Sequence, residues 1–394
     1  MTGPTPGIAG FATDRWKNRD MSKQPRMLIV SFSTIAKDPR VIKQVRYFSE
    51  RYAVTTCGFG PRPEGVVDHI EIPLTHTNKL DGRIITSKIY LAALWAQRGM
   101  RWVRKALKGR HFEVALANDI EAVPVALSAR PTHGVHADMH EYFPRWREDN
   151  ELWRRRISPY YEYLCKRYLP RAGSVTTVCD GIAREYEKLG NMTVDVVTNA
   201  TPYHDLSPTP VDRPLKVVHS GGALARRHME LMIEAAGRLP DKLTFDLYLV
   251  KSDPKHFDEL VALAGTTTNV RVLGPVPYED LISTLNGYDL GIYVLPPNGF
   301  NHLHALPNKI FDYVQARLGI MVGPSPEMAA VVRDHELGVV SDGFEVDDIE
   351  ATLAAVTAED VERWKQASHA VARELSAESE IEGWARAIDR LLAS

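Results

Sequence analysis

Residues 217–236 read VVHSGGALARRHMELMIEAA, and this stretch decides the fold class. An apolar run precedes a Ser-Gly-Gly turn and two arginines, and the residues that follow are apolar at helical spacing. Glycine lets the backbone approach a ligand closely, and the guanidinium groups of Arg226 and Arg227 suit phosphate oxygens. The third glycine of the dinucleotide fingerprint is missing. The stretch predicts a βα unit that either binds an anion or is a tight turn followed by exposed arginines.

The same alternation of short apolar runs and helical patterns continues on both sides. In the first half of the chain, the predicted strands are Met27–Ser31, Ala53–Cys57, Val114–Ala117, Gly134–Ala137, Val175–Val178 and Val194–Thr198. In the second half they are Leu215–His219, Leu243–Val250, Val270–Leu273, Leu290–Leu295, Ile320–Gly323 and Val339–Val340. Strands separated by helices indicate parallel sheets, so the fold class is α/β.

A proline-rich segment divides the chain. Residues 202–214 read PYHDLSPTPVDRP and show no periodic apolar pattern, which is typical of a semi-rigid linker. We expect a mobile leader at residues 1–25, an N-terminal domain at 26–205, a linker at 206–214, a C-terminal domain at 215–375 and a last helix at 376–394. Two doubly wound domains would face each other across a cleft at the carboxyl ends of their strands, where such folds bind ligands.

Composition excludes several classes of protein. The 394 residues are 44% hydrophobic and 25% charged, with a formal net charge of -2, which argues against a protein dedicated to nucleic acid. Three cysteines far apart favour neither a disulfide framework nor a zinc cluster, and they fit a reducing cytoplasm. No apolar run reaches the length of a membrane span, and the start of the chain lacks the apolar core of a signal peptide.

The most informative stretch for function is NHLHALPNKIFDYVQARLG, residues 301–319. Pro307 suits the first turn of a helix and Gly319 its end. The polar residues near the predicted helix start are Asn308, Lys309 and Asp312. Free N–H groups at the helix start would hold a diphosphate together with Lys309, and Asp312, one turn on, would accept hydrogen bonds from ribose. The alternative is a capped surface helix with an ion pair between Lys309 and Asp312.

Polar residues also follow the strands of the N-terminal domain. They are Asp38 and Arg40 after the first strand, Asn118 and Asp119 after the third, and Asp138, His140 and Glu141 in GVHADMHEY, residues 134–142. Their position at strand ends predicts contacts with substrate. Each has an alternative: a local ion pair for Asp38 and Arg40, a helix cap for Asn118 and Asp119, and a structural hydrogen bond for His140.

These motifs together resemble a GT-B glycosyltransferase, most closely the retaining family 4 group. The resemblance rests on the Gly-Gly-Arg segment, Leu306-Pro307-Asn308-Lys309 and Phe311-Asp312-Tyr313, together with Asp38-Pro39-Arg40, Asn118-Asp119, Asp138-x-His140-Glu141 and Thr198-Asn199. It implies two Rossmann-like domains facing each other across a cleft, with the donor held mainly by the second and the acceptor mainly by the first. It also implies that the last helix packs back on the N-terminal domain.

The resemblance assigns roles to individual residues. Arg227 and Lys309 match the residues that grip the donor diphosphate, and Asp312 matches the ribose-binding carboxylate. Gly221, Gly222, Asn308 and His304 complete the donor side; Asp38, Arg40, Asn118, Asp119 and Glu141 form the acceptor or sugar side; and His140 is the expected contact to the transferred sugar. His304 stands where the family has an acidic residue, so the Glu-x7-Glu motif is altered at both ends, which puts the recognition of the donor sugar in question.

The resemblance implies a transferase that moves a sugar from a nucleoside diphosphate donor, of the UDP or GDP type, to an acceptor hydroxyl. Retained anomeric configuration and independence of metal or any further cofactor are part of that expectation, with Arg227, Lys309 and His140 as the catalytic residues. Two alternatives stay open. A nucleotide-sugar 2-epimerase shares the two-domain fold, and a nucleotide-sugar-binding protein without turnover would explain His304 and Asp312 in place of glutamates.

A basic and aromatic surface is the last prediction. Residues 95–111, WAQRGMRWVRKALKGRH, contain six Lys or Arg and no acid, and residues 145–171 add further arginines and aromatics. Such a mixture is typical of an anionic lipid interface, which would place a cytoplasmic protein peripherally at the inner face of the membrane and give it a lipid-linked acceptor. The alternative is a solvated basic helix whose tryptophans fill the core, with a soluble sugar as acceptor.

Overall fold

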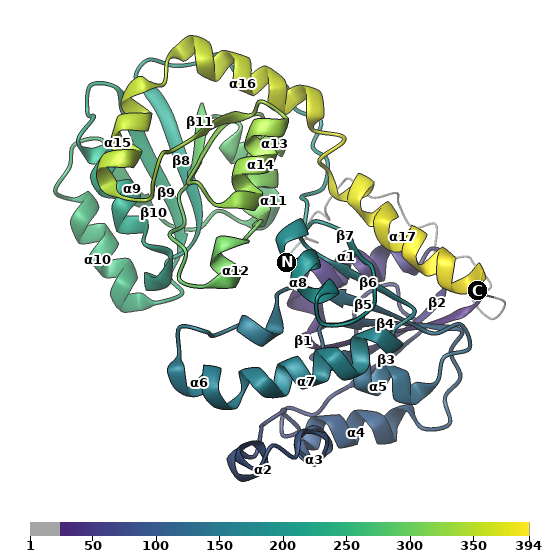
Figure 1. Cartoon of the computed structure of the whole chain (residues 1–394). Helices are drawn as coiled ribbons and strands as arrows, with labels where there is room; N and C mark the ends of the chain where they lie inside the picture. Colours follow the sequence, from purple (N-terminus) through teal and green to yellow (C-terminus); the bar gives the residue numbers. More distant parts are fainter. Residues whose placement is uncertain (1–23, 394) are drawn as a thin grey trace, which may run out of the picture.

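The computed structural model describes residues 24–393, which form two parallel α/β domains (Figure 1). All but the last two residues of the predicted leader lie outside this described range. Each domain has its own parallel sheet, and the two sheets have seven and six strands. This agrees with the α/β class and the two Rossmann-like units that the sequence predicts.

The N-terminal sheet has the doubly wound strand order β3-β2-β1-β4-β5-β6-β7. Its strands are β1 (Arg26–Thr34), β2 (Ala53–Phe59), β3 (Asp68–Glu71), β4 (Val114–Asn118), β5 (Val135–Met139), β6 (Ser174–Thr177) and β7 (Val194–Val196). Leu28 of β1 lies opposite Thr55 of β2 and Ala115 of β4, so the strand order reverses at β1. The sequence did not predict β3, because this edge strand is short and carries charge at both ends.

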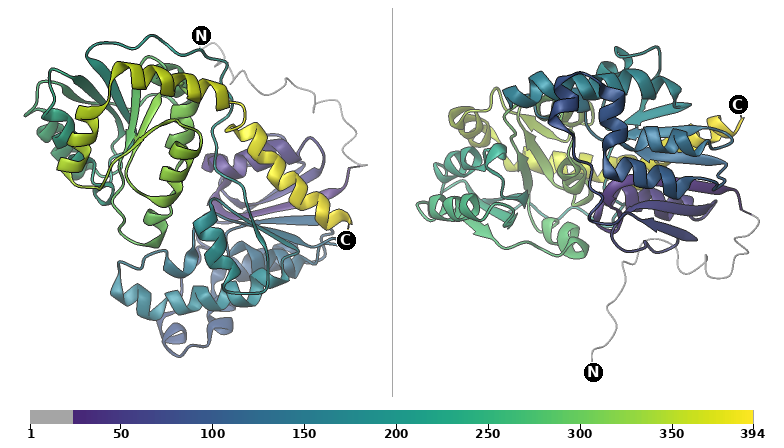
Figure 2. Two further views of the ribbon diagram at one scale, coloured as in Figure 1. Left: turned by 45° about the horizontal axis from the view of Figure 1, so that its top comes forward. Right: turned by 90° about the horizontal axis from the view of Figure 1, so that it is seen from below.

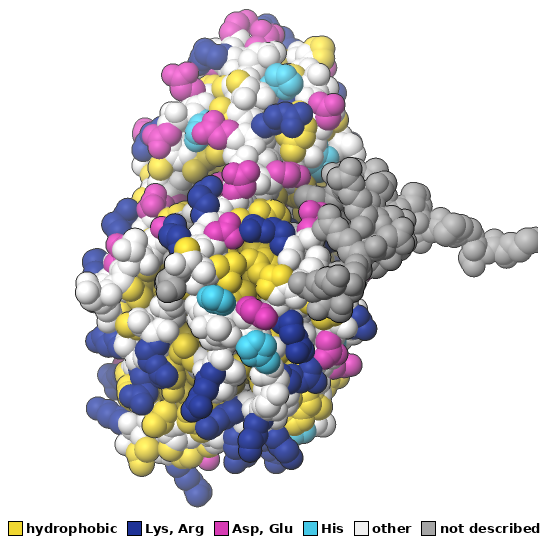
Figure 3. All heavy atoms as spheres, turned by 90° about the vertical axis from the view of Figure 1, so that its right-hand side faces the viewer, with side chains coloured by type: hydrophobic (Ala, Val, Ile, Leu, Met, Phe, Trp, Pro, Cys, Tyr) yellow, Lys and Arg dark blue, Asp and Glu magenta, His cyan; other side chains and the backbone are white. Residues whose placement is uncertain are grey.

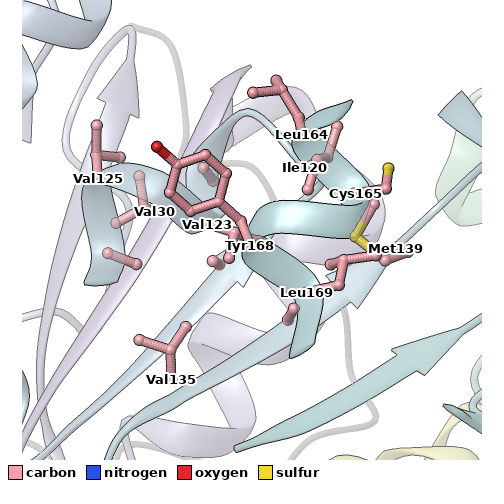
Figure 4. Close-up of a cluster of buried hydrophobic side chains, with 14 of the residues drawn as sticks. Val30, Ile120, Val123, Val125, Val135, Met139, Leu164, Cys165, Tyr168 and Leu169 are labelled. Atoms are coloured by element: carbon pink, nitrogen blue, oxygen red, sulfur yellow. The ribbon is translucent and has the colours of Figure 1, made fainter. Parts of the chain in front are cut away.

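Helices cover both faces of this sheet. They are α1 (Pro39–Phe48), α2 (Gly82–Thr86), α3 (Tyr90–Ala96), α4 (Arg98–Leu107), α5 (Ala122–Ala129), α6 (Glu151–Arg156), α7 (Ser158–Tyr168) and α8 (Asp180–Glu187). Figure 4 shows how the core forms: Tyr168 of α7 and Val123 of α5 pack with Val30 of β1, and all three are buried. Removal of such side chains from water is the main stabilising term of the domain.

The C-terminal sheet repeats the doubly wound pattern, with strand order β10-β9-β8-β11-β12-β13. Its strands are β8 (Leu215–Gly222), β9 (Leu243–Val250), β10 (Val270–Leu273), β11 (Leu290–Tyr293), β12 (Gly319–Val322) and β13 (Gly338–Val340). Its helices are α9 (Met229–Gly237), α10 (Pro254–Ala264), α11 (Tyr278–Leu285), α12 (Phe300–Leu303), α13 (Asn308–Gln315), α14 (Pro326–Asp334), α15 (Val346–Ala355) and α16 (Ala358–Val371). The order reverses at β8, where a ligand is expected.

The bounds of α13 differ from the prediction. Pro307 is the residue before the helix, and Gly319 is the first residue of β12 instead of the helix end. The helix stops earlier because Arg317 adopts a left-handed backbone conformation with φ 59°. The buried guanidinium of Arg317 donates to the carbonyl oxygens of Val314 and Gln315, which satisfies the last turn of the helix.

The chain crosses between the domains twice, and the two crossings lie side by side. The first is the proline-rich linker, and the second joins α16 to α17 (Ala377–Ala393), which packs on the N-terminal domain with Trp384 buried (Figure 2). The amide of Ala377 donates to Thr201 O at 2.9 Å. Arg317 donates to His204 O and Leu206 O of the linker. The two crossings are therefore attached to each other and to the C-terminal end of α13.

Candidate functional site

A pocket of about 340 Å³ lies between the domains at the carboxyl ends of their strands. Seven of the predicted site residues line it: Asp38, Arg40, His140, Glu141, Arg227, His304 and Asn308. Six are not part of this lining: Gly221, Gly222, Lys309, Asp312, Asn118 and Asp119. The structure thus brings predicted residues from both domains to one cleft, which is where two facing doubly wound domains bind ligands.

Gly221, Lys309 and Arg227 meet at the end of β8. A Cβ atom at Gly221 would lie 2.7 Å from Lys309 Cε, 2.9 Å from Lys309 Nζ and 3.4 Å from Arg227 Nη1. A side chain at Gly221 would therefore displace the end of the lysine from this position. Gly222 is less tightly enclosed, since its nearest neighbour would be Ser252 Oγ at 2.8 Å. The ammonium group of Lys309 also lies over the ring of Tyr293, 5.5 Å from its centroid.

The charges around Gly221, Lys309 and Arg227, a group called the Lys309 corner below, favour a bound anion. Burial and the nearby charge of Arg227 lower the pKa of Lys309 to about 8, although Asp312 acts in the opposite direction. Within residues 24–393, no acidic side chain forms an ion pair with Lys309 or Arg227. Two cations held together without a direct ion-pair partner raise the local potential, and a bound anion would relieve their repulsion.

The first turn of α13 adds backbone donors to the same corner. Pro307 precedes the helix and no side chain caps it, so the N–H groups of Asn308 and Lys309 are left without helical partners. The helix dipole adds partial positive charge at this end. Pro307 and Asn308 line the pocket, which places the start of the helix at its wall.

Asp312 lies one turn further along and is 7% exposed. It accepts a hydrogen bond from the hydroxyl of Thr201, at the first crossing between the domains. Burial raises the pKa of Asp312, while that hydrogen bond and the charges of Lys309 and Lys43 act to lower it. The ion pair of Lys309 with Asp312, which was the alternative interpretation of this helix, is absent from the described ion pairs, and the carboxylate is hydrogen-bonded to Thr201 and does not line the pocket.

His304 takes part in a junction between the domains. Its Nδ1 lies 2.9 Å from Glu327 Oε1, and the same oxygen accepts from the amide of Gly181 on α8 at 2.9 Å. A Cβ atom at Gly181 would lie 2.0 Å from His304 Nδ1, so glycine is required here for the domains to approach. The backbone oxygen of His304 also accepts from Cys179 Sγ. The side chain that replaces the expected acid therefore borders the pocket and joins the two domains.

On the other wall, a buried carboxylate organises the N-terminal domain. Asp138 is fully buried and accepts two hydrogen bonds from Arg40, at 2.7 Å each, and one each from Gln44 and Thr176, also at 2.7 Å. Arg40 further donates to Val197 O and Thr198 O and stacks on Trp384. Its ion pair is with Asp138, not with Asp38, so most donors of Arg40 are already engaged by the protein.

His140 stands between carboxylates. Its backbone N–H donates to Asp119 Oδ1 at 2.9 Å, Nδ1 lies 3.5 Å from Asp119 Oδ2, and Nε2 lies 3.4 Å from Asp138 Oδ2 and 3.1 Å from Asn118 Oδ1. Burial acts to lower the pKa of His140, but the charge of Asp119 and the hydrogen bond to Asp138 outweigh it and raise the pKa. Oxygen acceptors face both ring nitrogens, which favours the imidazolium form.

The remaining predicted residues have local roles as well. Asp38 caps α1 by accepting from the amides of Arg40 and Val41. Asn118 and Asp119 do not cap α5, since the residue before that helix is Glu121. Asn118 instead joins Gln44 to His140, and Asp119 adopts a positive φ of 65° that aims its carboxylate at the same histidine. Glu141 is exposed at the rim of the pocket.

The pocket lining also includes Arg226, which the sequence singled out as suited to phosphate oxygens, and Pro39, Asn199, Leu306 and Pro307, which belong to the motifs of the family resemblance. The lining residues that the sequence did not single out are Val178, Ile182, Tyr293, Leu295, Asn301, His302 and Ala305. Asn301, His302 and Ala305 lie in the stretch 301–319, so position next to a predicted residue would have found them. Tyr293 was hidden in a predicted strand, because an aromatic residue in a buried strand normally indicates core packing.

The basic and aromatic segments form part of the surface of the N-terminal domain. Trp95 and Trp102 are half-buried, Trp153 is buried and Trp146 is 42% exposed. Figure 3 shows Lys and Arg gathered over the lower part of the face it draws, in the N-terminal domain. No helix within the described range has the length and apolar character needed to cross a membrane. Nor does that range hold a group of three or more His, Cys, Asp or Glu side chains placed to bind a metal ion.

No family model and no curated protein matches the sequence. Solved structures do match the fold. HepE of Anabaena in complex with UDP-glucose has a TM-score of 0.67, with 14% identity over 93% of this chain and 99% of its own. The α,α-trehalose 6-phosphate synthase of Burkholderia multivorans has a TM-score of 0.66, with 10% identity over 94% of this chain and 97% of its own.

The pneumococcal O-GlcNAc transferase GtfA, in complex with UDP and GlcNAc, matches with a TM-score of 0.56 and 14% identity. That match covers 76% of this chain and 61% of GtfA. At these identities the similarity establishes architecture. The fold that the sequence resemblance implied is confirmed: the chain has the GT-B glycosyltransferase fold, with two Rossmann-like domains facing each other across a cleft.

Proposed function

We propose that this protein is a glycosyltransferase that moves a sugar from a nucleoside diphosphate donor to an acceptor hydroxyl, with retention of anomeric configuration. One observation carries the proposal: Lys309 and Arg227 converge beside Gly221, without an acidic partner among the described residues, at the uncapped start of α13. A diphosphate supplies the missing negative charge and accepts from both side chains and the helix amides.

The chemistry follows from where charge develops. When the bond from the anomeric carbon to the β-phosphate oxygen breaks, that phosphate gains negative charge. Lys309, Arg227 and the first amides of α13 would stabilise this charge in a cleft that excludes water. In this mechanism the diphosphate needs no metal, because two protein cations neutralise it. The resemblance to the retaining family 4 group supports retention.

His140 is the proposed contact to the transferred sugar on the N-terminal side. Its imidazolium, held by Asp119 and Asp138, would stabilise the developing phosphate charge, or would donate to a sugar hydroxyl by exchanging one of these contacts for the ligand. Arg40 is a positioning residue in this proposal, since it fixes Asp138 and through it the histidine. Asp38, Asn118, Asp119 and Glu141 are assigned to the acceptor or sugar side.

The donor is proposed to be a UDP-sugar. HepE and GtfA are similar structures that were solved with UDP-containing ligands. Asp312 would accept from ribose by exchanging its hydrogen bond to Thr201 for one to the ligand. The three cysteines are free and buried, which supports a cytoplasmic site of action.

The test has two stages. UDP, GDP and their sugars are first screened for an increase in thermal stability, because a ligand that binds only the folded state raises it. The donor that binds is then supplied with and without candidate acceptors, and released nucleotide and product anomer are measured. Transfer with retention supports the proposal. Isomerised donor in the absence of acceptor would show an epimerase, and tight binding without any turnover would show a binding protein.

Peripheral contact with an anionic membrane is proposed for the N-terminal domain. Exposed apolar side chains, Trp146 and Leu152, accompany the arginines of α6. Such a surface would bring the cleft to a lipid-linked acceptor. Co-sedimentation with vesicles of rising anionic lipid content, at low and high salt, tests this. If binding neither rises with anionic lipid nor falls with salt, the surface serves a soluble acceptor.

A further inference from the structure

A second and larger pocket, of about 950 Å³, lies in the N-terminal domain. It is lined by Thr75, Thr77, Lys79, Leu80, Asp81, Gly82, Arg83, Thr86, Ala96, Arg98, Arg101 and Arg156. None of these residues lines the pocket between the domains. The mechanism proposed above makes no use of them.

The charge of this lining is strongly one-sided. It holds five cationic side chains and one carboxylate. That carboxylate, Asp81, is engaged in capping α2, where it accepts from the amides of Arg83 and Ile84. Within the described range, none of the five cations forms an ion pair, whereas nearby Arg110 and Arg155 pair with acids at 2.6 Å. The pocket therefore gathers positive charge that the protein does not neutralise.

Four separate segments bring these cations together. Lys79 lies in the loop after β3, Arg83 on α2, Arg98 and Arg101 on the first turn of α4, and Arg156 at the end of α6. The loop after a strand and the start of the helix that leads into the next strand lie at the same edge of a parallel sheet. Figure 1 shows α2 and α3 on the outer side of α6, away from the C-terminal domain. The pocket therefore belongs to the acceptor-side domain.

We propose that this pocket binds a phosphate or diphosphate group carried by the acceptor. The inference rests on the proposed transfer reaction, which needs an acceptor on this domain. Several guanidinium groups around one space match a multiply charged anion that accepts hydrogen bonds in pairs. Leu80 and Ala96 provide an apolar wall for the group that carries the phosphate. The phosphate can belong to a soluble phosphosugar or to a lipid headgroup.

The test uses the full chain and inorganic pyrophosphate as the probe, measured by calorimetric titration. Saturating UDP first fills the donor site, so that only further binding is seen. Arg98→Gln with Arg101→Gln removes the α4 contribution, and Arg83→Gln with Arg156→Gln removes the opposite side. Lys105→Gln with Lys108→Gln is the matched control, because these exposed residues lie near the end of α4 and directly after it, outside the pocket.

Both pocket variants should weaken pyrophosphate binding at least tenfold, while the control changes it less than twofold. Equal loss in pocket and control variants would show a general charge effect and overturn the proposal, as would unchanged binding in the pocket variants. Circular dichroism and thermal unfolding confirm that each variant is folded. All substituted side chains are exposed, so folding should be retained.

Two further arms identify the source of the phosphate and separate this proposal from the transfer reaction. Glucose 1-phosphate tests a soluble ester, and phosphatidylcholine vesicles containing phosphatidic acid test a lipid one; loss of binding in the pocket variants in either arm supports the site. If UDP does not bind, the pyrophosphate titration is repeated on the Lys309→Met protein, in which anion binding at the Lys309 corner is weakened. If pyrophosphate binding then still depends on Arg98 and Arg101, the anion site in this pocket is supported even though UDP is not the donor.

Discussion

Replacing Lys309 with methionine is expected to stabilise the ligand-free protein and at the same time weaken nucleotide binding. The physical reason is the position of its side chain, half-buried beside Arg227 with no ion-pair partner among the described residues. Methionine keeps much of the side-chain volume, so the corner at Gly221 stays filled. Opposite signs for stability and binding are the signature of a residue kept for function.

The magnitude follows from the pKa. A fall from 10.5 to about 8 at about 1.4 kcal/mol per pKa unit corresponds to roughly 3 kcal/mol of unfavourable interaction for the charged lysine. Because the folded pKa is the lower one, this cost is fully present below pH 8 and is relieved as the pH rises through 8 towards 10.5. Loss of its contact to the leaving phosphate should cost about 2–4 kcal/mol in the transition state.

Urea unfolding at pH 7 and calorimetric nucleotide titration measure the two effects. Lys255→Met is the control, since that side chain is 89% exposed and pairs only with Glu259 on its own helix. It should change stability by no more than about 0.5 kcal/mol and leave binding intact. A Lys309→Met protein that binds nucleotide like the wild type, or that is less stable at pH 7 without ligand, would refute the reasoning.

Other substitutions test the remaining walls of the cleft. Asp312→Asn should weaken UDP or GDP binding; a nucleotide complex in which this carboxylate faces away from the ribose would contradict the assignment. His140→Gln should flatten the pH dependence of urea unfolding, because the raised pKa of His140 gives stability that is full below pH 6.5 and lost as the pH rises through the folded value; an unchanged slope would count against it. Trp384→Ala should cost about 3–5 kcal/mol in urea unfolding, clearly more than Trp146→Ala, whose side chain is 42% exposed, and similar losses for both would disprove the packing of α17.

Most strands were predictable because each is a short run of apolar residues in the sequence, which indicates a buried strand. β9 coincides with the predicted Leu243–Val250, and β10 with Val270–Leu273. The exceptions have physical causes. β3 has only one apolar residue, the buried Ile70, so its own sequence shows no strand pattern and its pairing with β2 defines it, and the end of α13 depends on the buried guanidinium of Arg317.

The candidate site could be predicted only in part, because the contacts that build it join residues far apart in the sequence. Lys309 and Gly221 were each identifiable from local motifs, but their contact requires both βα units to be folded. The partner of Arg40 is Asp138, which lies 98 positions away, so proximity in sequence suggested Asp38 instead. A similar long-range contact turns Asp312 to Thr201. Local motifs thus pointed to residues at the cleft, whereas the pairing of those residues depended on tertiary structure.

The two adjacent crossings of the chain have a mechanical consequence. A pair of tethers attached to each other, through Ala377 and Thr201, permits rotation of one domain against the other but opposes sliding and twisting. Arg317 connects that hinge to α13, the helix whose other end carries Lys309. Opening and closing would therefore swing Lys309, the proposed diphosphate contact, towards and away from His140 along a single arc. The separation of the two walls of the cleft would then depend on a single angle between the domains.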